Sequence, residues 1–176
     1  MNSELKEEVE LYFKILNFVY KEVELLNEED YEKWLELLDD NFEYFVIVGE
    51  ITQNKKLNFS KEKFLFSADK NKWRLYIQRL KSEYGWAYNY AKTFTRRIIG
   101  NVRIIERRGS EIHVNSSFIL LRIEGDEMIK GTFNLISGKR EDVIRIYSGG
   151  NEMKLYKRII YLDTPNYPSY NLYFPI

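Results

Sequence analysis

The chain has 176 residues, of which 44% are hydrophobic and 16% aromatic, so we expect one domain over residues 1–176 with a sizeable core. The charges of its 27 basic and 27 acidic residues cancel, so the chain has no net positive charge that would attract it to nucleic acid or to an anionic membrane. Cysteine is absent, which excludes disulfides, thiolate nucleophiles and iron–sulfur ligation by this chain. No apolar run approaches the ~20 residues of a membrane span, and the first residues are too polar for a signal sequence. We therefore expect a cytoplasmic protein.

Two consecutive helices are predicted at the start of the chain. Residues 3–26 show apolar side chains at spacings of three and four, the stripe of an amphipathic helix: Val9, Tyr12, Phe13, Leu16, Val19, Tyr20 and Val23. Asn27 is a candidate N-cap for a second helix, because Asp30 follows three residues later and Trp34 and Leu38 keep the helical spacing. The triplet Asp39-Asp40-Asn41 breaks the helical pattern and should end that helix.

A first strand is predicted over 42–48, and a third helix should begin after Ser67 or Asp69 and end near Gly85. The rest of the chain reads as long strands, over residues 95–107, 111–123, 128–138, 140–147 and 153–162. The runs on either side of Gly138 can also form one bent strand, because glycine often marks a bulge or kink. Gly149-Gly150-Asn151 indicates a hairpin turn. This order predicts an α+β fold, with helices on one face of an antiparallel sheet.

Several strands are apolar on both faces, notably 117–121, 134–136 and 159–162. A strand with one solvated face alternates between apolar and polar residues, so both faces of these strands should be covered. We therefore expect the second sheet face to pack against neighbouring subunits.

Five blocks, in the same order along the chain, carry a family resemblance. They are residues 24–40, 95–102, 138–145 (Gly-x-Arg-Glu-Asp-Val-x-Arg), 158–163 (Arg-Ile-Ile-Tyr-Leu-Asp) and 171–174. Together they resemble the small (beta) subunits of Rieske-type aromatic-ring-hydroxylating dioxygenases. The resemblance implies the SnoaL-like, nuclear-transport-factor-2-like fold, in which a strongly curved, cone-shaped sheet, mixed or antiparallel, wraps around about three N-terminal helices.

The same resemblance implies a structural, non-catalytic subunit that forms a homotrimer. Three large subunits would join it in a hetero-hexamer and would hold the Rieske [2Fe–2S] cluster and the mononuclear iron. This chain itself should hold no cofactor, since one histidine and no cysteine cannot supply the ligand set of either iron site.

Two alternatives stay open: a cavity enzyme of the same fold, such as a dehydratase or isomerase acting on a small aromatic or polycyclic compound, and a ligand-binding or scaffolding module. For catalysis the candidates are Asp40, because some enzymes of this fold place a general base near that position, and His113, the only histidine. We interpret Asp40 as a turn residue, since catalysis would also need an acid partner such as the Tyr44 hydroxyl. We interpret His113 as a structural residue, since catalysis would need a convergent partner in a pocket. The candidate cavity-lining residues are Trp34, Tyr44, Trp73 and Trp86.

Arginines inside apolar strands form the last group of candidates. An unpaired buried charge is costly, so Arg96, Arg97, Arg140 and Arg158 should be paired with carboxylates. The candidate partners are Glu141, Asp142 and Asp163, in the same chain or across an interface. Such pairs would fix subunit geometry, or they would be surface pairs worth ~0–1 kcal/mol each.

Overall fold

A computed structural model of the chain describes residues 3–51, 57–58, 64–81, 93–124, 132–147, 152–163 and 175–176. Three helices precede or interrupt the strands: α1 (Ser3–Asn27), α2 (Tyr31–Glu36) and α3 (Lys70–Lys81). The strands are β1 (Leu38–Val48), β2 (Glu50–Ile51), β3 (Leu57–Asn58), β4 (Phe64–Asp69), β5 (Thr93–Arg108), β6 (Glu111–Glu124), β7 (Thr132–Ile146) and β8 (Met153–Leu162). No helix in this part of the chain is long and apolar enough to cross a membrane.

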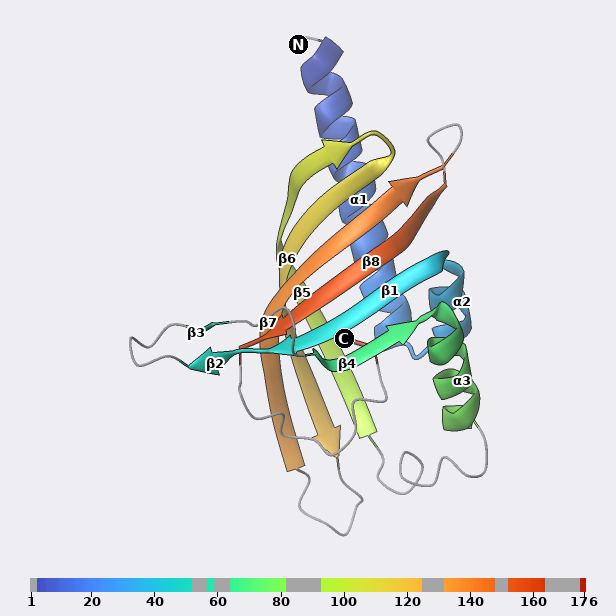
Figure 1. Cartoon of the computed structure of the whole chain (residues 1–176), viewed down its shortest axis with the longest axis vertical. Coiled ribbons are helices and arrows are strands. Elements are labelled where there is room, and N and C mark those ends of the chain that lie inside the picture. Colours follow the sequence, from blue (N-terminus) through green and yellow to red (C-terminus); the bar gives the residue numbers. More distant parts are fainter. Residues whose placement is uncertain are drawn as a thin grey trace.

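Six strands form one open, curved sheet in the order β4-β1-β8-β7-β6-β5 (Figure 1). Most neighbours are antiparallel, as predicted, but β1 runs parallel to β8. The sheet is therefore mixed, and β4 and β5 are its edges. α1 crosses behind the sheet against β5, while α2 and α3 lie beside β1 and β4 (Figure 1).

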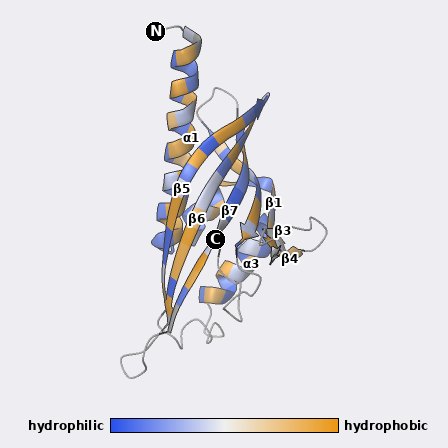
Figure 2. Ribbon diagram, turned by 90° about the vertical axis from the view of Figure 1, so that its left-hand side faces the viewer, coloured by the Kyte–Doolittle hydropathy of each residue, from blue (hydrophilic) through white to orange (hydrophobic). Residues whose placement is uncertain are grey.

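The helix predicted over residues 3–26 is confirmed, but of the predicted stripe only Val19 and Val23 are buried, with Leu16 partly buried against the core. Val9, Tyr12, Phe13 and Tyr20 are exposed, whereas the core face is formed by Ile15, Phe18, Val19, Glu22, Val23, Leu25 and Leu26. Two apolar stripes run along this helix. The buried stripe is interrupted by the charged Glu22, so its apolar pattern is harder to recognise in the sequence. Figure 2 shows hydrophobic residues recurring along the length of α1.

The starts of α2 and β1 differ from the prediction in detail. Asp30, not Asn27, caps α2, because its carboxylate accepts from the backbone N–H of Lys33 at 3.3 Å. Asn27 instead ends α1, and its side-chain amide exchanges two hydrogen bonds with the backbone of Arg97 in β5, at 2.7 and 3.1 Å. Asp69 caps α3, as one of the two predicted alternatives. The 39–41 triplet lies inside β1, not in a break before it.

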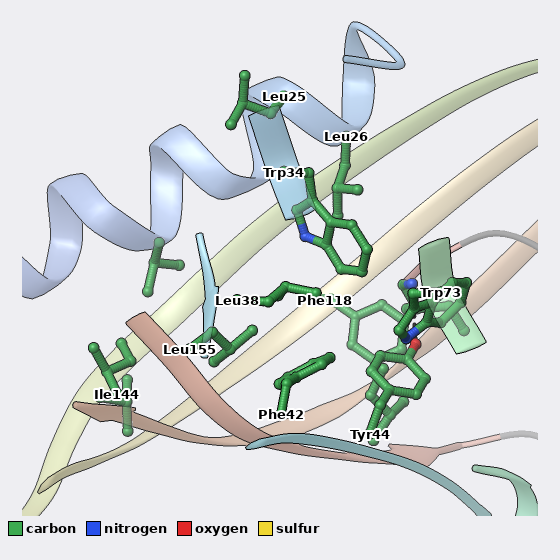
Figure 3. Close-up of a cluster of buried hydrophobic side chains, with 14 of the residues drawn as sticks. Leu25, Leu26, Trp34, Leu38, Phe42, Tyr44, Trp73, Phe118, Ile144 and Leu155 are labelled. Carbon is green, nitrogen blue, oxygen red and sulfur yellow. Dashed lines mark hydrogen bonds between the residues drawn. The ribbon is translucent and has the colours of Figure 1, made fainter. Parts of the chain in front are cut away.

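An aromatic cluster holds the two short helices against the sheet (Figure 3). Trp34 of α2 and Trp73 of α3 meet edge to face at 5.6 Å between ring centroids, and Tyr44 of β1 lies 5.1 Å from Trp73. All three rings are almost fully buried. Edge-to-face pairs of this kind add about 0.5–1.5 kcal/mol beyond the area they bury.

Two glycine positions shape the long strands. β7 runs unbroken through Gly138, which confirms the single-strand alternative. In β5 the register with β6 shifts between Gly100 and Arg103, and Asn101 adopts a positive φ of 53°. This bulge reverses which residues point inward along β5. The arms of the last hairpin pair antiparallel, but its turn, residues 148–151, lies outside the described residues.

Candidate functional site

Four charged side chains meet inside the molecule: Glu22 of α1, Arg140 and Asp142 of β7, and Arg158 of β8. The exposed fraction of each is 2% or less. Arg158 donates to Asp142 from Nε at 2.8 Å and to Glu22 from Nη1 at 2.8 Å. Arg140 donates from Nη2 to Asp142 at 2.8 Å and to Glu22 at 3.2 Å. We call these four residues the ion cluster.

The strand register explains how the cluster assembles. Asp142 lies directly opposite Arg158 in the β7–β8 pair, and Arg140 shares their inward face because strand side chains repeat every two residues. α1 then supplies Glu22 from the helix that covers this face of the sheet. The cluster therefore ties one helix to two strands that are far from it in sequence.

Hydrogen bonds extend the cluster to the 175–176 segment. Trp34 donates to Glu22 at 2.9 Å, and Arg158 also donates to the carbonyl oxygen of Ile176 at 3.2 Å. The backbone N–H of Ile176 donates to the Tyr44 hydroxyl at 3.1 Å. Arg97, itself buried, donates to the carbonyl of Pro175 from Nε and Nη2 at 3.0 and 2.7 Å. This segment is thus held by side chains from β1, β5 and β8.

Both cluster carboxyls are ionised. Burial alone would raise the pKa of Glu22, but the guanidinium groups of Arg158 and Arg140 outweigh it and leave the pKa lowered. The same balance, burial against Arg140 and Arg158, lowers the pKa of Asp142. Burial raises the pKa of Tyr44 to about 12, so its hydroxyl stays neutral. The cluster is a set of mutually satisfied charges, and no carboxyl in it has the raised pKa that a general acid needs.

The sequence analysis missed Glu22 entirely. A signal for it existed, because position 22 lies four residues after Phe18, three after Val19 and four before Leu26, all of which are buried. A carboxylate at the centre of an apolar helical stripe indicates a buried partner of opposite charge. The predicted stripe instead followed the apolar residues that are exposed in the structure, such as Tyr12 and Phe13.

The opposite, outer face of the sheet exposes a row of large apolar side chains. Ile98 of β5 pairs with Ile119 of β6, and their exposed fractions are 62% and 45%. Leu135 of β7, 53% exposed, lies opposite Leu121 of β6. Hydrophobic residues also recur along β5 and β6 in Figure 2. We call the exposed members the outer patch: Phe94, Ile98, Ile119, Ile123 and Leu135.

The structure separates the predicted arginines and carboxylates into two environments. Arg140, Arg158 and Asp142 lie in the ion cluster, whereas Arg96 is exposed and lies over the ring of Phe94, at 5.1 Å from its centroid. Asp163 accepts from the Ser137 hydroxyl at 2.9 Å, and Glu141 accepts from Tyr161 at 3.1 Å. Arg96 was expected to be paired with a carboxylate, but its side chain is exposed on the outer face of the sheet.

The candidate catalytic residues lie apart from one another. The side chain of Asp40 is 94% exposed and pairs with Lys70 at 2.8 Å, and this hydrogen bond lowers the pKa of Asp40. His113 lies on the outer face of β6, and β7 and β8 separate that strand from β1. The structure therefore does not bring these two residues into one site.

Three of the four candidate cavity-lining residues, Trp34, Tyr44 and Trp73, pack against one another in the core, and Trp86 lies outside the described residues. Among the residues that the structure describes, no group of three or more His, Cys, Asp or Glu side chains is arranged to hold a metal ion.

Comparison with known proteins identifies the family. The family described as "Ring hydroxylating beta subunit" matches residues 21–168 of this chain. The chain belongs to this family. The matched residues 21–168 include the ion cluster, the aromatic cluster of Trp34, Tyr44 and Trp73, and the outer patch.

Relatives agree with this membership over nearly the whole chain. The chain is 30% identical to the 3-phenylpropionate/cinnamic acid dioxygenase subunit beta of Photorhabdus laumondii, with 98% of this chain and 95% of that protein covered. It is 29% identical to the biphenyl 2,3-dioxygenase subunit beta of Rhodococcus jostii, with 93% and 88% covered. A solved structure of naphthalene 1,2-dioxygenase with bound indole superposes with a TM-score of 0.75 at 19% identity, covering 99% of this chain and 94% of that chain. The fold is the SnoaL-like one that the sequence resemblance implied.

Proposed function

We propose that this chain is the non-catalytic small subunit of a cytoplasmic aromatic-ring-hydroxylating dioxygenase. It forms a homotrimer, and three large subunits join it in a hetero-hexamer. The large subunits hold the Rieske cluster and the mononuclear iron, and this chain supplies the scaffold. The observation that carries the proposal is the family match over residues 21–168.

The outer patch supports self-association. Its five apolar side chains are 40% to 62% exposed in the isolated chain, side by side on β5, β6 and β7. Contiguous apolar surface of this kind is unusual on a monomer and marks an interaction site. Closed cyclic symmetry is the usual way in which identical subunits bury such a patch.

The ion cluster supports the scaffold role. A general acid or base requires a proton-exchanging group with free access to a substrate. Glu22 and Asp142 instead have lowered pKa values, and each is bonded to both cluster arginines. These residues stabilise the arrangement of α1, β7 and β8. A cavity enzyme would have to use Asp40 and His113 instead, and these two residues lie on separate strands, β1 and β6.

The oligomeric state of the purified full chain tests the trimer. Light scattering at micromolar concentration is expected to give three times the mass of one chain. The variant Ile98→Arg places a charge in the middle of the outer patch, and an unpaired buried charge costs roughly 3–5 kcal/mol. That variant is expected to sediment mainly as a folded monomer, with an unchanged circular dichroism spectrum.

Leu75→Arg is the matched control, because Leu75 is 65% exposed on α3, away from the outer patch. It should leave the trimer intact. A wild-type chain that scatters as a monodisperse monomer, or an Ile98→Arg variant that stays trimeric, contradicts the proposed interface.

A further inference from the structure

A second apolar surface lies on α1, away from the core. Leu5, Val9, Phe13 and Tyr20 share one side of this helix, because helical residues four or seven apart lie above one another. Their exposed fractions are 39% to 56% in the isolated chain, and we call these four residues the helix stripe. Outside this stripe and the outer patch, the exposed large apolar side chains of the described residues are scattered: Tyr12, Phe64, Leu65, Leu75, Ile105 and Tyr147.

The first turns of α1 extend past the sheet. Every side chain from Leu5 to Glu10 is exposed, and burial against the rest of the chain begins only at Leu11. Figures 1 and 2 show this end of the helix beyond the ends of the strands. The helix stripe therefore begins on a part of α1 that no described element of its own chain covers.

The helix stripe and the outer patch have opposite charges beside them. Residues 4–10 of α1 include four glutamates and one lysine. On the outer face of the sheet, the exposed Arg96 of β5 and Lys139 of β7 lie diagonally on either side of Ile119. Complementary charges of this kind steer two surfaces together and select their relative orientation. The two surfaces therefore match in both apolar character and charge.

A ring of three identical subunits joins two different surfaces of each chain. The outer patch of one subunit therefore needs a complement elsewhere on the next subunit, and the helix stripe is the other row of exposed apolar side chains in the described part of the chain. We propose that the helix stripe of one subunit packs on the outer patch of the next, with the acidic turns of α1 beside Arg96 and Lys139. This contact rests on the proposed homotrimer and assigns its second surface.

The variant Phe13→Glu tests the helix stripe in the full chain. It places an unpaired charge in an apolar contact, so it is expected to sediment mainly as a folded monomer at a concentration where the wild type is a trimer. Lys14→Glu is the matched control, because residue 14 is exposed on the side of α1 away from the stripe, and this variant should stay trimeric. The circular dichroism spectra of both variants should match that of the wild type.

Crosslinking identifies which surfaces meet, even if Phe13→Glu fails to fold. The chain has no cysteine, so a double variant with Val9→Cys and Ile119→Cys carries one thiol on each surface. A short bismaleimide is expected to join its subunits into covalent dimers and trimers, and to join neither single variant. Covalent dimers of the Ile119→Cys single variant would show that two outer patches meet each other, which overturns the contact.

The oligomeric state of the wild type separates a failure of this contact from a failure of the trimer. A monomeric wild type contradicts the trimer and, with it, this contact. A trimeric wild type whose Phe13→Glu variant is also trimeric, or whose double-cysteine variant gives no covalent trimer, overturns this contact alone. If a trimeric Phe13→Glu variant no longer binds a large subunit, the contact is likewise overturned and the helix stripe belongs to the large-subunit interface.

Discussion

Replacing Gly138 with alanine is expected to lower the free energy of unfolding by about 3 kcal/mol or more. A Cβ at this position would lie 2.2 Å from the backbone oxygen of Tyr161 and 2.9 Å from the ring of Phe118. The first contact is with the neighbouring strand, where β7 pairs with β8, so the two strands that carry the ion cluster must separate locally. For a chain of this size the thermal midpoint should fall by roughly 6–12 °C.

Gly100→Ala is the matched control for this prediction. A Cβ at Gly100 meets no atom within 4 Å, so the substitution should change the stability by no more than about 1 kcal/mol. Thermal or urea unfolding of the two variants beside the wild type measures the difference. Equal midpoints for the two alanine variants would show that β7 and β8 can accommodate the added methyl group.

Glu22→Gln should destabilise the chain by about 3–5 kcal/mol, although the two side chains have nearly the same shape. The amide carries no charge, so Arg140 and Arg158 would share the single carboxylate of Asp142 in the interior. The control is Glu43→Gln, which breaks the Glu43–Lys157 pair at 2.8 Å on the partly exposed surface. That change should cost about 1 kcal/mol or less. Urea unfolding of both variants gives the comparison.

The acid dependence of stability provides a second comparison of the wild type with the Glu22→Gln variant. The folded-state pKa values of Glu22 and Asp142 lie below their ordinary values of 4.5 and 3.8. Their contribution is therefore fully present above about pH 5 and is lost as the pH falls through the lowered pKa values. The gap between wild type and Glu22→Gln should narrow as the pH falls below 4.5. A gap that is constant down to the acid transition would mean that folding does not lower the pKa of Glu22.

Local sequence patterns predicted the helices and the long strands because periodicity and turn residues act over short distances. The pairing of β1 with β8 could not be read in this way, since its two strands are at opposite ends of the chain. The start of β1 was misplaced because Asp39 and Asp40, which are turn formers, begin a strand whose first residue, Leu38, is fully buried.

For the site, the sequence indicated that strand arginines need carboxylates, and one of the predicted partners, Asp142, accepts from both Arg140 and Arg158. The contribution of α1 was missed because Glu22 is one of many acidic residues on an amphipathic helix, and the apolar stripe predicted for that helix did not include position 22. The sequence left open whether Arg96 is buried or lies at the surface. Alternation along β5 places Arg96 and Arg97 on opposite faces, and only the second is buried.

Turnover of an assembled dioxygenase containing a double variant of this subunit tests the non-catalytic role most directly. The chain, with Asp40→Asn and His113→Ala, would be co-expressed with a large subunit of the dioxygenase family, and oxygen uptake would be measured with the aromatic substrate of that complex. We expect native mass spectrometry to show three large and three small subunits, and turnover equal to that of the complex with wild-type chain. Loss of turnover in a complex of unchanged stoichiometry would contradict the account, because it would place one of these side chains in the reaction.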